Sequence, residues 1–409
     1  MKIIKLYNDL VFYLSNEDKE SIINFLNKNN ESLKEIINIS TFKIYPIHYL
    51  CINDIIDIEL IEILINIGFK LQNGLEQKTI LFYLLKFKTI NLEILNLLKD
   101  NDFDFNTKDI YNENILHYLC YYEYDDDIFN FIKDNINEQL VNQFDVQPLT
   151  PLLLSTQLNN NKTTYNLLKL NCNINNRNYN NNTSLMFACM NNNLKLVQKL
   201  IDMGGDINLI DNQNDIAFFY ACGCDNKDKL NLELIKYLIS INIDKKHLSE
   251  DNYNALHYAS GVNNNNTDYL VIDYLLSIDI DPNIICNIKK KTFIYYFYKN
   301  SKNKILDKQN IKKMIKKYDL IKYENINNDL IFLFYDDDEF LDILKFNKTI
   351  VNKLDSFCLI CKDSFESKSK IISCKNNHHI DLECMIIYNN NKCPLCLEII
   401  NIKDFFFIK

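Results

Sequence analysis

The sequence predicts a mostly α-helical protein, in which a stack of short helical pairs precedes a small domain held together by metal ions. A six-residue pattern returns every 33–38 residues through most of the chain. Six of the 13 cysteines lie within the last 52 of the 409 residues. A fixed period of this length indicates stacked supersecondary units. Closely paired cysteines indicate a metal site.

The repeated pattern opens the first helix of each predicted unit. Clear copies are Asn114-Ile115-Leu116-His117-Tyr118-Leu119 and Asn254-Ala255-Leu256-His257-Tyr258-Ala259. Eight copies begin at residues 45, 79, 114, 150, 183, 216, 254 and 292. About 20 residues after its start, each unit carries a second apolar helix, such as 194–201. These helices are apolar on more than one side, so neighbouring units must cover them.

The residue that ends each second helix tolerates the left-handed backbone conformation, as a helix C-terminus often requires. These residues are Gly68, Asn101, Asn135, Asn171, Gly204, Asn242 and Asp279. With the T-P-L-H-x-A-like openings and the L-L-x-x-G-A-x-x-N-like segment 200–208, the pattern resembles the ankyrin repeat. The resemblance implies an ankyrin-repeat solenoid whose surface binds another protein.

The periodicity divides the chain into five segments. Residues 1–42 predict capping helices near Ile3–Leu14 and Lys19–Leu26, with Asn29 left-handed. The remaining segments are the ankyrin repeats (43–298), degenerate terminal repeats and a linker (299–353), the cysteine-rich domain (354–402) and a tail (403–409). The terminal repeats include a Lys-rich outer face over Asn310–Lys317, as a solubilising cap requires. The linker contains the acidic run Asp336–Glu339 and a helix-like segment up to Lys353.

Several conspicuous residues of the repeats are interpreted as structural. His48, His117 and His257 occupy the same position of the pattern. In ankyrin repeats this histidine bridges backbone groups of neighbouring units. Cys189 and Cys222 are expected to be buried thiols of the core. The runs Asn180–Asn182 and Asn263–Asn266 are expected to be loop filler.

The cysteine-rich segment begins and ends with a Cys-x-x-Cys pair, which places two thiolates on one zinc ion. Its pattern, C-x2-C-x12-C-x3-H-x2-D-x2-C-x8-C-P-x-C, resembles the RING finger over about residues 355–402. The resemblance implies two interleaved Zn²⁺ sites. One set is Cys358, Cys361, Asp381 and Cys384, and the other is Cys374, His378, Cys393 and Cys396. Asp381 stands where Cys or His is usual, and His379 competes with His378 for the ligand position.

RING domains are the E2-binding part of ubiquitin ligases, so the resemblance implies a RING-type E3 ubiquitin ligase. It would hold a ubiquitin-charged E2 in a reactive conformation without a covalent intermediate. The matching E2 contacts are Ile360, Tyr388 and Pro394. The alternative is that these three side chains fill the core of a small domain. Leu397-Glu398 replaces the basic linchpin of many active RING domains, which favours a second hypothesis, a non-catalytic ankyrin scaffold with a structural zinc module.

Composition limits the partners. The chain has a formal net charge of −9 and a single arginine, Arg177, a poor basis for binding phosphate backbones. It has no apolar run of the roughly 18 residues that a membrane helix needs. Charged residues interrupt its first segment, unlike a signal peptide. We therefore expect an intracellular, cytoplasmic protein whose partners are an E2 enzyme and a target protein, with neither nucleic acid nor membrane.

Overall fold

The structure is a computed structural model of the chain. It describes residues 2–16, 18–37, 50, 58–69, 78–223, 230–262, 268–300, 304–320, 326, 329–330, 347–351, 370–373, 379–381 and 404–408. The chain divides into two compact units, Met1–Asn212 (unit 1) and Gln213–Lys409 (unit 2). Each unit is described by itself.

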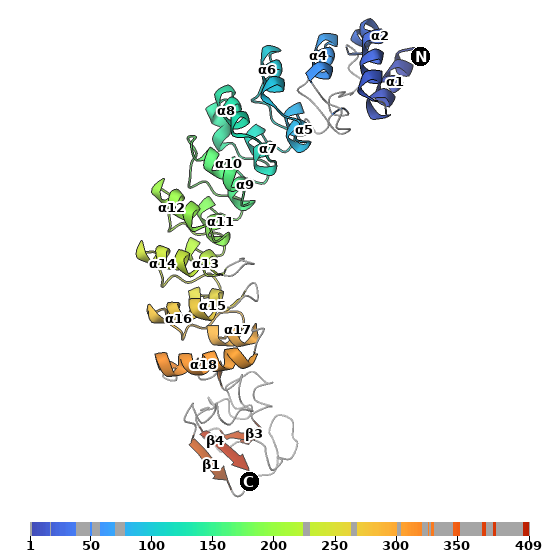
Figure 1. Cartoon of the computed structure of the whole chain (residues 1–409). Coiled ribbons are helices and arrows are strands. Elements are labelled where there is room, and N and C mark those ends of the chain that lie inside the picture. The colour runs from blue at the N-terminus through green and yellow to red at the C-terminus, as the bar shows by residue number, and fades with distance from the viewer. Residues whose placement is uncertain are drawn as a thin grey trace. The chain divides into compact units, whose positions relative to one another are not determined.

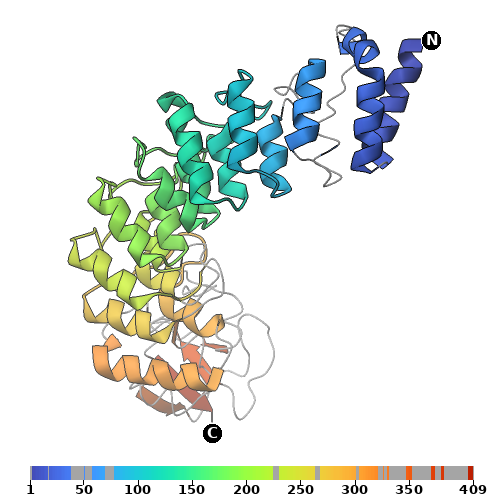
Figure 2. The same cartoon turned by 45° about the horizontal axis from the view of Figure 1, so that its top comes forward.

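Unit 1 consists of short helices that follow one another in chain order (Figure 1). They are α1 (Lys2–Asn16), α2 (Lys19–Ile37), α4 (Ile58–Ile67), α5 (Ile80–Lys86), α6 (Leu92–Asp100), α7 (Ile115–Tyr121), α8 (Asp126–Asn135), the 3₁₀ helix η2 (Glu138–Asn142), α9 (Pro151–Gln157), α10 (Asn161–Leu167), α11 (Ser184–Met190) and α12 (Leu194–Asp202). The first helices of successive repeats pack on one another, α5 on α7, α7 on α9 and α9 on α11. Helix α9 also packs on the second helix α10, and α11 packs on α12 (Figure 2).

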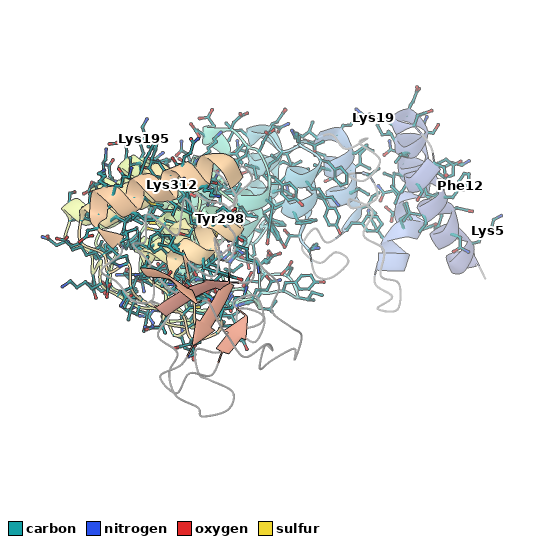
Figure 3. All side chains as sticks on the ribbon, turned by 90° about the horizontal axis from the view of Figure 1, so that it is seen from below. Lys5, Phe12, Lys19, Lys195, Tyr298 and Lys312 are labelled. Carbon is teal, nitrogen blue, oxygen red and sulfur yellow. The ribbon has the colours of Figure 1, made fainter. Side chains whose placement is uncertain are left out.

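Unit 2 continues the same helix-pair pattern and ends in a sheet. Its helices are α13 (Ala217–Ala221), α14 (Leu232–Ser240), α15 (Ala255–Ala259), α16 (Tyr269–Ser277), α17 (Phe293–Lys299) and α18 (Lys304–Tyr318). Helix α15 packs on α13, α16 and α17. Helix α18 buries Ile311, Met314 and Ile315, and Lys312 lies on the same helix (Figure 3).

Polar side chains cap four of the described first helices where the repeat pattern begins. These N-cap residues are Asn114, Thr150, Thr183 and Asn254. At the same position, Thr79, Ile216 and Thr292 make no side-chain cap bond. The Thr150 hydroxyl accepts a hydrogen bond from the Leu153 backbone N–H (3.3 Å). Asn91 caps α6 in the same way, accepting from Ile94 N–H (2.8 Å). Such side chains satisfy backbone donors that a helix start leaves without a partner.

The left-handed positions agree only in part with the prediction. Gly68, Gly204, Asn242 and Asp279 have positive φ, as predicted. At the end of α6 the left-handed residue is Asp102, one residue later than predicted. Asn135 and Asn171 do not have positive φ, and Ile136, the residue after α8, has an extended backbone (φ −111°). These two predictions are wrong because the chain leaves the helix without a left-handed turn.

The first two helices are longer than predicted. Helix α1 buries Leu10 and Leu14 against α2 and leaves Phe12 exposed (Figure 3). Helix α2 runs without interruption from Lys19 to Ile37. The prediction that Asn29 ends this helix in a left-handed conformation is therefore wrong. Its amide instead donates back to the Phe25 carbonyl (2.8 Å), four residues earlier, a bond that a continuing helix allows.

The sheet of unit 2 contains strands β1 (Asn347–Val351), β2 (Lys370–Ser373), β3 (His379–Asp381) and β4 (Asp404–Ile408) in the order β1-β4-β2-β3. Strand β1 is parallel to β4, whereas β2 is antiparallel to both β4 and β3. Strand β1 lies in the segment predicted to be helix-like up to Lys353, so that prediction is wrong for residues 347–351. Strand β4 lies in the segment predicted as a tail.

Candidate functional site

The loops before the first helices are built on short polar side chains. Asp109 Oδ1 accepts hydrogen bonds from the backbone N–H groups of Tyr111 (2.8 Å) and Glu113 (2.9 Å). Asp145, Asn178 and Ser249 accept equivalent backbone bonds in their own loops. Each of these residues lies five positions before the start of its repeat. Sequence reasoning missed this position, although its polar residues and fixed phase were visible.

Asparagine side chains link the loops of successive repeats. Asn112, Asn181, Asn214 and Asn252 have positive φ at the same position of four loops. The Asn214 amide donates to the Leu248 carbonyl (2.7 Å), and the Asn252 amide donates to the Ile285 carbonyl (2.7 Å). Asn112 donates likewise to the Phe144 carbonyl (2.5 Å). These bonds tie each loop to the next and position the loop tips.

Asn181 shows that the run Asn180–Asn182 is not loop filler. Asn181 has a φ of 61°, and its amide donates to the Asn212 side-chain oxygen (2.6 Å). The Asn180 carbonyl accepts a bond from the Asn212 backbone N–H (3.0 Å). The earlier interpretation is therefore wrong for this run. Residues 263–266 lie outside the described residues.

The two repeat histidines that the structure describes are bridges between neighbouring repeats, as predicted. His117 Nδ1 accepts from the Asn114 backbone N–H (3.2 Å), so Nε2 carries the proton and donates to the Leu149 carbonyl (3.1 Å). His257 Nε2 reaches the Lys291 carbonyl (3.3 Å). Burial lowers the pKa of both imidazoles to about 4, so they are neutral at pH 7. His48 lies outside the described residues.

The tyrosine that follows each histidine has different surroundings in the two units. In unit 2, the buried Tyr258 hydroxyl donates to the buried Asp215 carboxylate at 2.6 and 2.8 Å from its two oxygens. In unit 1, the buried Tyr118 hydroxyl makes no hydrogen bond within 3.5 Å. It still lies near enough to Asp109 to lower the pKa of that carboxyl, a smaller effect than the rise that burial causes.

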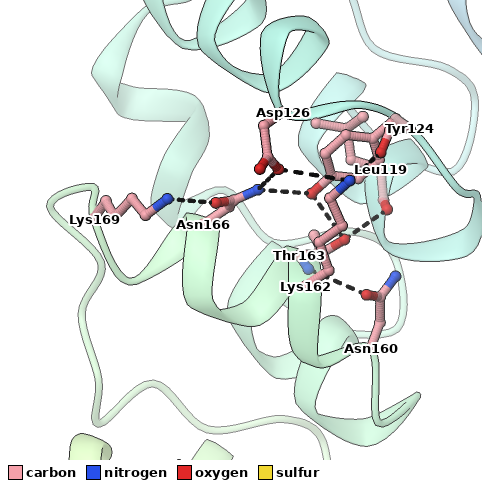
Figure 4. A network of polar contacts seen from close by, with 8 residues as sticks. All are labelled: Leu119, Tyr124, Asp126, Asn160, Lys162, Thr163, Asn166 and Lys169. Carbon is pink, nitrogen blue, oxygen red and sulfur yellow. Dashed lines mark hydrogen bonds and ion pairs between the residues drawn. The ribbon is translucent and has the colours of Figure 1, made fainter.

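A polar network joins the α7–α8 connection to α10 (Figure 4). The Thr163 hydroxyl donates to the Leu119 carbonyl (3.0 Å) and accepts from the Tyr124 hydroxyl (3.0 Å). Lys162 lies 3.5 Å from Asp126 and also donates to the Tyr124 carbonyl. Most of these atoms bond within the network, so it holds two repeats together rather than offering free groups for chemistry.

The tips of three successive loops in unit 1 expose apolar side chains. Ile110, Tyr111, Val146 and Tyr179 are 49%, 40%, 58% and 80% exposed. We call these four residues the loop-tip strip. The first two loops lie side by side, because the Val146 backbone N–H donates to the Tyr111 carbonyl (2.9 Å). Exposed apolar side chains on adjacent loops form a surface suited to a protein partner.

Carboxylates lie at the base of these loops. The Tyr121 hydroxyl donates to Glu113 Oε1 (2.5 Å). The pKa of Glu113 is raised, mainly by burial and further by Asp109 and Asp145. The Tyr121 hydrogen bond and Lys78 act in the opposite direction. Burial also raises the pKa of Asp145. The arrangement concentrates negative charge beside an exposed tyrosine.

The repeat cysteines that the structure describes are structural. Cys189 and Cys222 are buried, as predicted. Burial raises the pKa of Cys189, and it raises the pKa of Cys172 to about 12. Thiols with raised pKa values are poor nucleophiles.

The predicted zinc and E2 sites fall almost entirely outside the described residues. Asp381 and its neighbour His379 lie in strand β3. The other seven predicted ligands (Cys358, Cys361, Cys374, His378, Cys384, Cys393, Cys396) and the predicted E2 contacts (Ile360, Tyr388, Pro394) lie outside the described residues. Within the described part of the chain, no three His, Cys, Asp or Glu side chains gather as a metal site would require. In that same part, no helix is long and apolar enough to span a membrane.

A model of the family described as "Ankyrin repeats (3 copies)" matches residues 116–211 and 185–286. The chain contains ankyrin repeats. Within residues 116–286, the helix pairs and the bridging histidines are thus parts of ankyrin repeats. Ankyrin repeats imply the binding of protein partners, and the loop-tip strip is the candidate surface for one.

A relative shares a short stretch with the chain. Over 67 residues the chain is 32% identical to an Arabidopsis thaliana protein named "Probable E3 ubiquitin-protein ligase RHA4A". The stretch covers 16% of this chain and 38% of the relative. The chain therefore matches less than half the length of that protein.

Proposed function

We propose that this protein is a RING-type E3 ubiquitin ligase, in which the ankyrin repeats hold a target protein and the C-terminal segment recruits a ubiquitin-charged E2. The observation that carries the proposal is the spacing of six cysteines, His378 and Asp381 over residues 358–396. The partial similarity to a protein named as an E3 ligase supports it.

Zinc suits the proposed donor set. Thiolates and imidazole are the donors that zinc prefers in structural sites. The strand register also supports the second site. Ser373 pairs with His379 across β2 and β3, and in the sequence these two residues adjoin Cys374 and His378. The pairing brings together the two ends of the connection that carries these ligands. With two zinc ions bound, the segment would be cross-linked at both ends, and folding would depend on the metal.

The proposed E2 contact is a small surface of Ile360, Tyr388 and Pro394. A ligase of this kind forms no covalent bond with ubiquitin; it orients the charged E2 beside a lysine of the bound target, which is catalysis by proximity. The ankyrin repeats would supply the second half of that proximity by holding the target.

The test uses the full chain in zinc-containing buffer with a panel of ubiquitin-charged E2 enzymes. The chain is expected to speed discharge of ubiquitin to free lysine. Ile360→Ala is expected to abolish this effect and leave the zinc content at two ions. Ile288→Ala, at a 64% exposed isoleucine of unit 2, is the control and should discharge normally. A chain that binds zinc but discharges no E2 of the panel contradicts the proposal.

Leu397-Glu398 favours a second candidate, an ankyrin scaffold whose zinc module has no E2 partner. The basic residue that holds the bound ubiquitin in many RING domains is missing at this position. Leu397→Arg separates the two candidates. A ligase should discharge ubiquitin several-fold faster with this arginine. A scaffold should show neither discharge nor an E2 contact in an NMR titration, with or without it.

A further inference from the structure

The loop-tip strip of unit 1 is formed by the loops of three successive repeats. Tyr111 and Val146 are held side by side by a backbone hydrogen bond. Tyr179 occupies the corresponding turn of the next repeat. Tyrosine presents a large contact area at a low cost in side-chain entropy, and it is enriched among the residues that dominate binding energy.

The loops are fixed before any partner arrives. Asp109, Asp145 and Asn178 hold the turns through paired backbone bonds. The Asn112 amide connects the first loop to the second through the Phe144 carbonyl. A preorganised surface loses little conformational entropy when it binds.

The charge beside the strip is negative. Glu113 is half-buried, accepts the Tyr121 hydroxyl and lies close enough to Asp109 and Asp145 to be repelled by both. Asp109 is 6% exposed, and its Oδ2 has no hydrogen-bond partner. The nearby cation Lys78 lies over the rings of Phe82 and Tyr111, 4.6 and 5.5 Å from their centroids. Burial and the two carboxylates outweigh its effect, because the pKa of Glu113 is raised.

We propose that the loop-tip strip binds an extended segment of the target protein that carries apolar side chains and a lysine or arginine. The apolar side chains would pack on Tyr111, Val146 and Tyr179, and the cation would lie beside Glu113 and Tyr121. The partner's positive charge would relieve the repulsion among the three carboxylates. An acidic segment would increase it.

The inference rests on the proposed function only in taking the ankyrin repeats as the target-binding part. Arg177 lies two residues before Tyr179 and would repel a basic side chain at that end of the strip. The preference for a basic side chain therefore depends on Glu113, at the other end. In unit 2 the corresponding tips carry Glu250 and Asp251 in one loop and the exposed Ile288, followed by three lysines, in another, so unit 1 is where the described loops place apolar tips in succession.

The experiment selects a random 12-residue peptide library on the immobilised full chain, with counter-selection on the double variant Val146→Asp, Tyr179→Ser. Both substituted side chains are more than half exposed, so the variant is expected to fold. Enriched peptides are expected to combine apolar residues with lysine or arginine. The enriched peptide of highest affinity is then measured by fluorescence polarisation on three variants.

Glu113→Gln is expected to weaken that peptide about tenfold, as removal of a charge partner at an interface does. The double variant is expected to lose binding. Leu270→Ser, at a 59% exposed leucine of unit 2, is the control and should bind as the parent does. Acidic or charge-indifferent peptides, no enrichment, or unchanged affinity in Glu113→Gln would overturn the inference. Since E2 discharge to free lysine does not use this strip, failure here and failure of the ligase proposal are separate results.

Discussion

The repeats that begin at Asn114 and Asn254, one in each unit, share four of their six motif residues and differ in the contact of the tyrosine. In both, asparagine caps the helix and the histidine bridges to a carbonyl of the next repeat. The next residue, tyrosine, bonds to Asp215 in unit 2, whereas in unit 1 it lies near Asp109 but makes no hydrogen bond within 3.5 Å. The motif thus determines contacts with the backbone, which every repeat offers. A contact with another side chain depends on what the neighbouring repeat supplies.

The largest expected effect is a loss of stability at low pH, caused by the buried histidine that both repeats share. The imidazoles of His117 and His257 have pKa values of about 4 in the folded protein, below the ordinary 6.5. The unfolded chain therefore binds more protons between these values, and stability is lost as the pH falls from about 6.5 to about 4. At about 1.4 kcal/mol per pKa unit, each histidine contributes on the order of 3 kcal/mol. We expect equal losses from both, measured by amide hydrogen exchange of α7 and α15 at pH 7, 6 and 5.

His117→Gln and His257→Gln provide the control for this prediction. Each variant should flatten the pH dependence in its own helix and leave the other helix unchanged. A pH dependence that persists in both variants would show that other groups cause it. Local exchange is the suitable measurement, because repeat arrays do not unfold as one cooperative unit.

The next largest expected effect is the loss of the tyrosine–carboxylate hydrogen bond, which the structure shows in unit 2 and not in unit 1. Tyr258→Phe removes a hydrogen bond to a buried carboxylate and is expected to cost about 2 kcal/mol. Tyr118→Phe removes a hydroxyl without a hydrogen-bond partner and is expected to change stability by less than about 0.5 kcal/mol. Urea denaturation of the two variants, followed by circular dichroism, measures both. Equal costs would contradict the difference between the two repeats.

The smallest effect concerns the loops. Asn112→Ala and Asn252→Ala each remove an amide bond to the next loop and place alanine at positive φ, with an expected cost of about 1–2 kcal/mol. Asn112→Gly and Asn252→Gly remove the bond without the backbone strain and should cost about half as much. Hydrogen exchange of the loop amides measures the change. If alanine and glycine had the same effect, backbone strain would have no role.

Much of the ankyrin fold could be predicted from the sequence, because every repeat carries the same signals. The histidine bridges and the starts of the helices follow from short local motifs. The left-handed positions were predicted less well, since Asn135 and Asn171 are compatible with that conformation but do not require it. In an asparagine-rich chain the residue type alone is a weak guide.

The candidate surface could not be predicted, because it depends on exposure and on neighbours in other repeats. Val146 and Val197 are the same residue type, yet the first is exposed at a loop tip and the second is buried in α12. The raised pKa of Glu113 is due in part to Asp145, 32 residues away in the sequence. For the cysteine-rich segment 354–402 the opposite holds. There the spacing of the ligands alone predicts the chemistry, and no described side chain tests that prediction.

The asparagine hydrogen bonds between loops are also sensitive to slow chemical change of the amide. Asparagine side chains hydrolyse slowly to carboxylates. At Asn252 that change would replace a donor by a negative charge facing the Ile285 carbonyl oxygen, now 2.7 Å from the amide nitrogen. The same loss at Asn214 would separate its loop from the Leu248 carbonyl. As the protein ages, the hydrogen bonds between successive loops would therefore be lost one by one, while the helices stayed intact.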